Sequence, residues 1–470
     1  MSSRRLAALV GLLAFALAAA DCSATRANPT GAGGGGAGSA GSTTTSSGQG
    51  GAGGIGVETD GGLPTGLRFT GTVWGPHADG KSPLFAVPGA LVLASKDPPD
   101  AIPACNACVK LPVGAQYALS GADGSFQLDV TPGTSFYLVV EKGQFRRVSQ
   151  VSAPDATGIQ VLGEIYTTLP NHTDLPNGDA VPRLALVYGD YDHIEDVLSK
   201  VGIGGEDGAF GHQWGTESGF FDVYDNSGPS EPKHGQSLSA LLHDPQKLAG
   251  YDVILFSCSY NANFAFMKDA VVQQNLRDFV WNGGKLYVSD YAMPVVEMAW
   301  NEFVWFTDPV HGGCTENQFP PNCNHGPPFD SPATSPDPGL SAWLKAMGSL
   351  DGLVIKENWD TIGGLAPSKV GVDPVTMTPL LEKPKVWVEG PWAYSTQDLM
   401  DLGIDPATWD KSAHPLTVAF PYNCGRVLFT TYHTVGGTIG GKHPGLLPQE
   451  MILFYLLMEL TVCQEGPIVK

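Results

Sequence analysis

Three side chains that could do chemistry each follow an apolar segment with the composition of a buried strand. They are Cys258, Asp290 and His433. A histidine that contacts a thiol lowers the pKa of that thiol and makes it a nucleophile. One hypothesis is therefore a Cys258–His433 pair for covalent catalysis, with Asp290 as the third candidate. The alternative is a buried, unreactive cysteine at a strand end and a histidine satisfied by hydrogen bonds.

Further polar residues lie at the ends of the same segments, and we predict that they bind a ligand: Asp190, Asp192, Ser289 and Tyr291. In an open α/β sheet, ligands bind at the carboxyl ends of the strands. One alternative is a cation or hydrolytic-metal site made of Asp190, Asp192, Asp290 and His433. Another is that Asp190 and Asp192 only cap the helix that follows. We predict no metal ion and no cofactor.

The elements that position these residues alternate between strand and helix over residues 182–466. Apolar runs of strand length alternate with helical periodicity, which predicts a mostly parallel sheet covered on both faces. A hairpin and an amphipathic helix close the chain. The predicted strands span 184–188, 252–256, 285–289, 416–420 and 426–432, and the predicted helices span 193–201, 265–281, 293–300 and 449–462.

This region resembles the class I glutamine amidotransferase-like superfamily in its ThuA-like branch. The resemblance rests on YDVILF at 251–256, LRDFVWNGGKLYVSD at 276–290 and GRVLFTTYHT at 425–434. It implies a flavodoxin-like α/β domain. Active members carry a nucleophilic cysteine in the sharp turn after the strand that follows the Gly-Gly pair. This chain has Ser289-Asp290 there, so the amidotransferase reaction is not expected, and we lean toward a protein that is not an enzyme.

Residues 66–168 show short alternating strands separated by turn signals, which predicts a β-sandwich. The strands cover 67–74, 90–94, 125–130, 135–141 and 144–151. The segments GTV at 71–73, VPGALV at 87–92 and ADGSF at 122–126 resemble the carboxypeptidase regulatory-like domain, a transthyretin- or immunoglobulin-like module. The resemblance implies a spacer, stabilising or adhesion role and no peptidase activity.

An aromatic cluster and a long loop lie in the middle of the α/β region. Trp300, Phe303, Trp305 and Phe306 either form a glycan-stacking surface or belong to the core. The loop 307–338 carries two histidines and two cysteines, His311, Cys314, Cys323 and His325. These could bind zinc, but in an exported protein a loop closed by a disulfide is favoured.

The eight cysteines fit an oxidising compartment. Cys258 is predicted to stay single, and three disulfides are predicted: Cys105–Cys108, Cys314–Cys323 and Cys424–Cys463. The Cys105–Cys108 motif has no second Cys-x-x-Cys to complete a zinc site, and it lies in a proline-flanked loop of the β-domain rather than at a helix start. A structural disulfide is therefore the favoured interpretation.

The N-terminus predicts export. Arg4 and Arg5 precede 15 apolar residues, a run about 22 Å long as a helix and too short for a bilayer core. Residues 1–22 are therefore predicted to be a signal peptide. Either signal peptidase cleaves after Ala20, or Cys22 takes a lipid, as Ala-Ala-Asp-Cys resembles a lipobox. The Gly/Ser/Thr-rich stretch 23–65 is predicted to be a disordered linker.

The net charge of −21 opposes binding to nucleic acid. The fold class predicted is multidomain: a β-sandwich, then an α/β flavodoxin-like domain. Our leading hypothesis is a non-catalytic lipoprotein of the outer membrane or cell surface that binds or adheres to glycan or another envelope component. The alternative localisation is the periplasm or the extracellular medium after secretion. The alternative functions are an extracellular hydrolase that uses the strand-end site and a structural spacer.

Overall fold

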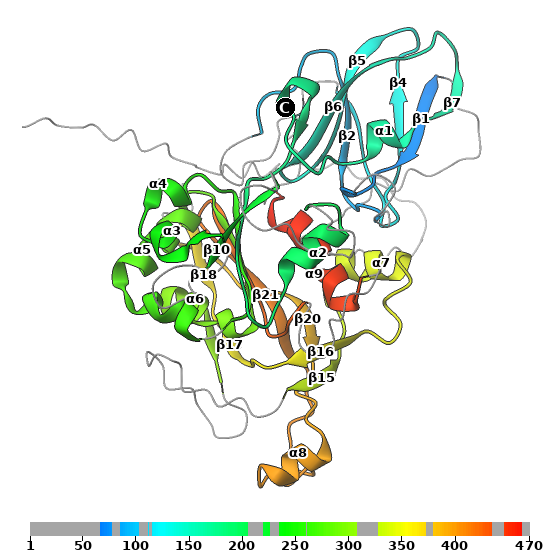
Figure 1. Ribbon diagram of the computed structural model, residues 1–470. Helices are drawn as coiled ribbons and strands as arrows, with labels where there is room; N and C mark the ends of the chain where they lie inside the picture. The colour runs from blue at the N-terminus through cyan, green and yellow to red at the C-terminus, as the bar shows by residue number, and fades with distance from the viewer. Residues whose placement is uncertain are drawn as a thin grey trace, which may run out of the picture.

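The structure is a computed structural model of the 470-residue chain. It describes residues 66–77, 85–102, 111, 115–204, 220–225, 235–259, 261–307, 328–372, 379–434 and 446–462. The predicted signal peptide, the linker and Cys22 lie outside these ranges, as do His311, His325 and the cysteines other than Cys258 and Cys424. No helix in the described ranges is long and apolar enough to span a membrane. The chain folds into a multidomain, sheet-rich α/β structure (Figure 1).

Residues 66–180, which we call the N-terminal unit, form two sheets. The first has three strands in the order β4-β1-β7, and the second has five in the order β3-β2-β5-β6-β8. The predicted strands are present, and a hairpin at Lys142-Gly143 joins β5 to β6. A helical turn and a 3-10 turn, which the sequence did not predict, follow β7. The bounds are β1 Leu67–Thr72, β2 Leu91–Ser95, β3 Gln116–Leu119, β4 Ser125–Val130, β5 Ser135–Lys142, β6 Phe145–Ser152, β7 Gly158–Val161, α1 Glu164–Thr167, η1 Leu175–Asn177 and β8 Asp179–Ala180.

Strand β4 shows why this unit folds as sheets. Phe126, Leu128 and Val130 are buried, and the residues between them are exposed. An alternation with a period of two places every apolar side chain on one face of a strand.

Residues 181–462, which we call the α/β unit, are built on an eight-stranded sheet in the order β11-β10-β9-β12-β13-β22-β21-β20. The strands from β11 to β22 in this order are parallel to one another. Strand β21 pairs antiparallel with β22, and β20 pairs antiparallel with β21. The prediction of a mostly parallel sheet closed by a hairpin is confirmed. The bounds are β9 Leu184–Val187, β10 Phe221–Asp225, β11 Gln236–Ser237, β12 Val253–Phe256, β13 Lys285–Ser289, β20 Lys385–Gly390, β21 His414–Tyr422 and β22 Gly425–Thr430.

Helices cover both faces of this sheet (Figure 1). One apolar core joins the sheet to α3, α4, α5 and α6, and the other joins it to α2, α7 and α9. Consecutive residues of a strand such as β12 contribute to opposite cores, as a strand buried on both faces requires. The bounds are α2 Ile194–Lys200, α3 Leu238–Leu242, α4 Pro245–Leu248, α5 Ala270–Trp281, α6 Pro294–Trp300, α7 Pro338–Ala346 and α9 Pro448–Leu460.

Smaller elements complete the unit. Three two-stranded sheets pair β14 with β17, β15 with β16 and β18 with β19, and α8 begins at a capping box formed by Ser395 and Asp398. The bounds are η3 Asn261–Lys268, η4 Asp290–Ala292, β14 Val304–Phe306, β15 Phe329–Pro332, β16 Val354–Asn358, β17 Ile362–Leu365, β18 Ser368–Val372, β19 Pro379–Glu382 and α8 Thr396–Asp401.

Two helix predictions need correction. The helix predicted over 265–281 is a 3-10 segment, η3, followed by α5. The break lies at Asp269, whose side chain accepts a hydrogen bond from the backbone N–H of Val271 and caps α5. The last helix, α9, is not amphipathic, because nearly all of its residues are buried. It packs between the eight-stranded sheet and the N-terminal unit.

The two units share one apolar core. The ring of Phe85 lies 5.4 Å from that of Phe454 in α9, and the indole N–H of Trp343 in α7 donates to the carbonyl of Ala86 at 2.7 Å. At the tip of the β5–β6 hairpin, Gln144 donates to Asp252 at 2.8 Å. The units are therefore packed together by apolar and hydrogen-bonded contacts.

The aromatic cluster, for which a glycan-stacking surface and a place in the core were the alternatives, is largely core. Trp300, Phe303 and Phe306 are buried, and only Trp305 is exposed, at 39%. The buried rings pack against aromatic side chains of β21 and β22, such as Phe420 and Phe429. The sequence alone did not show which rings face the sheet, and in the structure three of the four rings belong to the core.

Candidate functional site

The candidate site lies where four neighbouring strands, β9, β12, β13 and β22, reach their carboxyl ends. Because parallel strands end at the same edge, residues far apart in sequence meet there. The turn after β9 passes so close to the turn after β12 that a Cβ at Gly189 would lie 2.3 Å from the carbonyl oxygen of Cys258. Glycine at position 189 lets these two turns approach each other.

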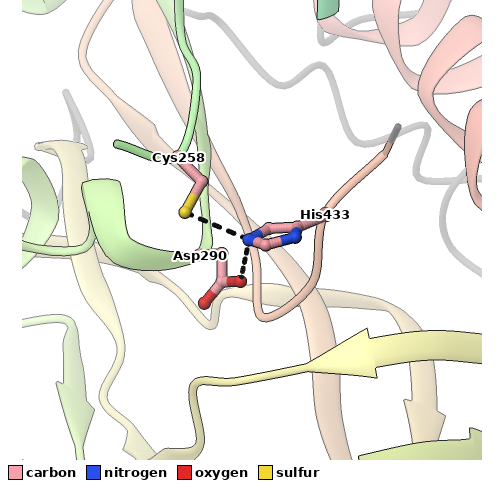
Figure 2. Close-up of side chains that lie close together, drawn as sticks. All are labelled: Cys258, Asp290 and His433. Atoms are coloured by element: carbon pink, nitrogen blue, oxygen red, sulfur yellow. Dashed lines mark hydrogen bonds and ion pairs between the residues drawn. The ribbon is translucent and has the colours of Figure 1, made fainter. Parts of the chain in front are cut away.

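Cys258, Asp290 and His433 converge at this edge, as the sequence analysis anticipated (Figure 2). Nε2 of His433 lies 3.1 Å from Sγ of Cys258 and 2.8 Å from Oδ2 of Asp290. Cys258 and Asp290 are fully buried, and His433 is 5% exposed. The thiol and the carboxylate therefore face the same imidazole nitrogen, while Nδ1 of His433 lies 3.7 Å from Oε2 of Glu357.

Asp290 adopts an uncommon backbone conformation. Its φ is 46°, in the left-handed region, directly after the last residue of β13. Such a conformation costs of the order of 1 kcal/mol for a residue other than glycine and persists only where the surroundings impose it. Neither carboxylate oxygen of Asp290 has a hydrogen-bond partner in the described part of the chain. Its contact with His433 is thus an ion pair rather than an aligned hydrogen bond.

Burial and charge set the protonation of the three groups. Burial raises the pKa of Asp290 to about 6, although the charge of His433 acts in the opposite direction. Burial lowers the pKa of His433, but the charges of Asp290 and Cys258 and the contacts with them together outweigh burial, so that this pKa lies above its ordinary value. Burial, reinforced by Asp290, raises the pKa of the Cys258 thiol. At neutral pH an imidazolium–carboxylate pair therefore lies beside an uncharged thiol.

Asp192 and Ser289 support this edge from inside the protein. The Ser289 hydroxyl donates to Asp192 at 2.7 Å and accepts from the backbone N–H of Cys258 at 3.0 Å. Asp192 also accepts from the backbone and the hydroxyl of Thr434, at 3.1 and 2.6 Å. The two residues, which we predicted to bind a ligand, therefore hold the turns that carry Cys258 and His433.

The hypothesis that Asp190 and Asp192 cap the next helix is wrong. The N-cap of α2 is His193, without a capping side-chain hydrogen bond. Asp190 instead accepts from the hydroxyl of Ser259 at 2.9 Å. Tyr291, the fourth predicted binding residue, lies in η4, with its ring 6.0 Å from that of Trp359.

The sequence analysis missed two acidic residues near the site. Asp360 is fully buried, and burial followed by the charges of Asp290 and Glu297 raises its pKa well above the ordinary value. Glu357 faces Nδ1 of His433 and has a left-handed φ of 51°. Both residues lie in or just after β16, in a stretch whose polar composition resembles an exposed segment, so no signal in the sequence marked them.

Among the described residues, Cys258, Asp290 and His433 have donor atoms close enough to share one ion, all lying within 4.8 Å of one another. This set differs from the cation site considered from the sequence, because Cys258 replaces Asp190 and Asp192. The alternative zinc ligands in the loop 307–338 lie outside the described residues.

The described cysteines are Cys258 and Cys424. Cys258 is free, as predicted, and Cys424 is disulfide-bonded. Cys463, the predicted partner of Cys424, lies just beyond the described residues, which end at 462, so this pairing stays a prediction.

The other two predicted disulfides also stay predictions. Both cysteines of each pair lie outside the described residues: Cys105 and Cys108 in the N-terminal unit, and Cys314 and Cys323 in the loop 307–338.

No protein-family model and no curated protein matches the chain. Among solved structures, the cytoplasmic protein STM3548 from Salmonella typhimurium is 10% identical, with a TM-score of 0.30, over 60% of this chain and 99% of that one. A ThuA-like protein from Bacteroides uniformis ATCC 8492 is 10% identical, with a TM-score of 0.31, over 59% and 90%. Likenesses this weak carry no argument about activity.

Proposed function

We propose that this chain is an exported, non-catalytic binding protein whose α/β unit holds its ligand at the carboxyl ends of β12, β13 and β22. The observation that carries the proposal is the convergence of Cys258, Asp290 and His433 on one point at this edge, with Nε2 of His433 contacting both other groups. Oδ2 of Asp290 faces the charge of His433, whereas Oδ1 is buried without a hydrogen-bond partner in the described part of the chain, and a donor on a ligand would stabilise it there.

The arrangement differs from a thiol-based catalytic triad. In a triad, the acid contacts one imidazole nitrogen and the nucleophile contacts the other, so that the base is free to take the proton. Here the acid and the thiol compete for Nε2 of His433, and burial keeps the thiol of Cys258 protonated. These contacts favour binding over covalent catalysis, and they are the reason that the hydrolase takes second place.

The turn after β13 gives further support. Active members of the class I glutamine amidotransferase-like superfamily carry their nucleophilic cysteine in this turn, and we propose that the α/β unit belongs to the ThuA-like branch of that superfamily. The residue with the strained backbone in this chain is Asp290, at φ 46°. A carboxylate in that place fits a ligand with positive charge or hydrogen-bond donors better than it fits acyl transfer.

For the N-terminal unit we propose a carboxypeptidase regulatory-like β-sandwich that stabilises and presents the α/β unit. The shared apolar core and the hydrogen bond from Trp343 to Ala86 support this role over that of an independent spacer. We also propose that Cys22 carries a lipid and that residues 23–65 tether the protein to an outer membrane. Mass spectrometry of the mature N-terminus tests the lipid directly: an unmodified N-terminus at Asp21 would exclude it.

A ligand screen tests the binding function. Full-length protein is heated with a panel of divalent metal ions, soluble glycans and small cations, and the melting temperature is recorded. We expect at least one compound to raise the melting temperature of the wild type but not that of His433→Gln. The matched control is His243→Gln, an exposed histidine that contacts Asp269 away from the site.

The same preparation separates binding from hydrolysis. Chromogenic ester, amide and glycoside substrates are offered to the wild type and to Cys258→Ser. Turnover that disappears in Cys258→Ser would establish the hydrolase and refute the proposal, whereas binding without turnover supports it.

A further inference from the structure

The three converging groups come from three neighbouring strands of the sheet. Cys258 follows β12, Asp290 follows β13 and His433 follows β22, and these strands are adjacent in the order β12-β13-β22. Their donor atoms all lie within 4.8 Å of one another. A thiol, a carboxylate and an imidazole that meet in the interior at this spacing form a set of donors around one point.

The side chains around this point are predominantly acidic. Asp290 and Asp360 are fully buried, and Glu297 is 6% exposed. The charges of Glu357 and Asp192 oppose ionisation of Asp290, and those of Asp290 and Glu297 oppose ionisation of Asp360. The basic group that opposes this charge in both cases is His433. A bound cation at this point would stabilise the ionised forms of these acidic side chains.

We propose that Cys258, Asp290 and His433 bind one zinc ion. This inference rests on the proposed function, because it names the ligand of the same edge. A thiolate and an imidazole favour Zn²⁺ over Mg²⁺ and Ca²⁺, which prefer oxygen ligands. Three protein ligands leave the fourth tetrahedral position to water or to a small molecule.

The two distances from Nε2 of His433 require only a small adjustment. Zinc bonds of about 2.0–2.3 Å at tetrahedral angles place two ligand atoms about 3.4–3.6 Å apart. The observed separations from Nε2 of His433 are 3.1 Å to Sγ and 2.8 Å to Oδ2. Each must open by roughly 0.5 Å, which small side-chain rotations supply. Ligation also displaces the protons of the thiol and of Nε2, so binding releases protons without any change of oxidation state.

The surroundings hold two of the three ligands, Cys258 and His433, in place. The backbone N–H of Cys258 donates to Ser289 at 3.0 Å, and Gln449 donates to the carbonyl of His433 at 3.0 Å. Oε2 of Glu357, 3.7 Å from Nδ1 of His433, lies on the side of the ring where a carboxylate orients a metal-bound histidine. These contacts fix the groups from behind and leave Sγ, Oδ2 and Nε2 facing one another.

The experiment is a zinc titration of full-length, chelator-treated protein, followed by competition with a chromogenic chelator. The variants are Cys258→Ser, Asp290→Asn and His433→Gln. The matched controls are Asp330→Asn and His243→Gln, since both residues are exposed and lie in other ion pairs. We expect one zinc per wild-type and control chain. Each ligand variant should lower the affinity by more than about 100-fold, beyond the 10–100-fold cost of changing an outer-shell partner.

Cobalt provides a readout that does not depend on how the buried variants fold. Co²⁺ added to the wild type should give the visible bands of a tetrahedral ion and a thiolate-to-metal absorption, and zinc should displace both. Zinc binding that is unchanged in all three variants would place the ion elsewhere, for example in the loop 307–338, and would overturn the inference. Absence of zinc binding at micromolar concentrations would overturn it as well.

The outcomes also separate this inference from the proposed function. An organic ligand that stabilises the wild type but not His433→Gln, in a protein that binds no zinc, would refute the metal and leave the binding function standing. Hydrolysis that depends on Cys258 in a zinc-free protein would refute both.

Discussion

The carboxylate of Asp290 lies 2.8 Å from Nε2 of His433, and both side chains are buried at the ends of adjacent strands. Each group compensates the charge of the other in a place where water cannot. The pair therefore contributes to the stability of the α/β unit and also forms part of its binding site. The two roles can be measured separately.

Asp290→Asn should destabilise the metal-free protein. Asparagine tolerates the left-handed backbone at this position but removes the charge, so the imidazolium of His433 loses its close partner. Removing one partner of a buried ion pair costs about 3–5 kcal/mol, and we expect a loss near the lower end in urea unfolding at pH 7 with a chelator present. Asp330→Asn, an exposed control, should stay within about 0.5 kcal/mol of the wild type. Equal losses in the two variants would contradict a stabilising Asp290–His433 pair.

Cys258 should be unreactive in the folded, metal-free protein. Burial and the neighbouring carboxylate raise the pKa of its thiol, and the side chain is fully buried. Since only the thiolate reacts, each unit of raised pKa lowers the reactive fraction about tenfold. Alkylation by iodoacetamide at pH 8, followed by mass spectrometry, should be at least about 100-fold slower than in urea-unfolded protein. Rapid labelling of the native protein would reveal an accessible thiolate and would favour the hydrolase.

Glu450 should make stability fall as pH rises from about 4.5 to 7. It forms a buried ion pair with Lys200, with 2.7 Å between the charged atoms, yet burial outweighs this partner and raises the Glu450 pKa from 4.5 to about 7. Between these values the native state binds more protons than the unfolded state, so the free energy of unfolding decreases with pH. The contribution is fully present below about pH 4.5 and is lost above about pH 7, with an upper limit of about 3 kcal/mol.

Urea unfolding across this pH range measures the effect of Glu450. Glu450→Gln should have a shallower slope than the wild type between pH 4.5 and 7, whereas Glu164→Gln, at an exposed position, should keep the wild-type slope. A wild-type slope preserved in Glu450→Gln would show that another group is responsible.

Gly143→Ala should weaken the packing between the two units. A Cβ at this position, where φ is 59°, would lie 2.0 Å from the hydroxyl oxygen of Thr461, just after α9. Gly352→Ala is the matched control, because Gly352 also has a positive φ, 74°, but has nothing within 4 Å of its Cβ position. Thermal and urea unfolding should show Gly143→Ala to be less stable than the control by about 1–3 kcal/mol. Equal stability would mean that the hairpin tip does not press against the α/β unit.

The elements with a strong local signal could be predicted from the sequence. The continuous apolar runs of β9, β12 and β13 and the alternation in β4 appear where they were expected. Asp269 shows the limit of prediction from local patterns. The helical pattern of the sequence runs through this residue, but α5 begins after it, because Asp269 takes the cap position. The full burial of α9 was not predictable either, because it depends on a second unit that covers the outer side of this helix.

By itself, the sequence determined that Cys258, Asp290 and His433 each follow a strand, because strand length and apolar composition are local properties. Only the tertiary structure decided that these residues meet at a single nitrogen, because that depends on strand order and on the backbone of Asp290. The tertiary structure also places Asp192 and Ser289 where they support the turns of the site, and it brings Asp360 and Glu357 close to the site. Electrostatic interactions depend on distance and burial in the folded protein. Cys258 and His433, which are 175 positions apart in the sequence, therefore interact only when the sheet has formed.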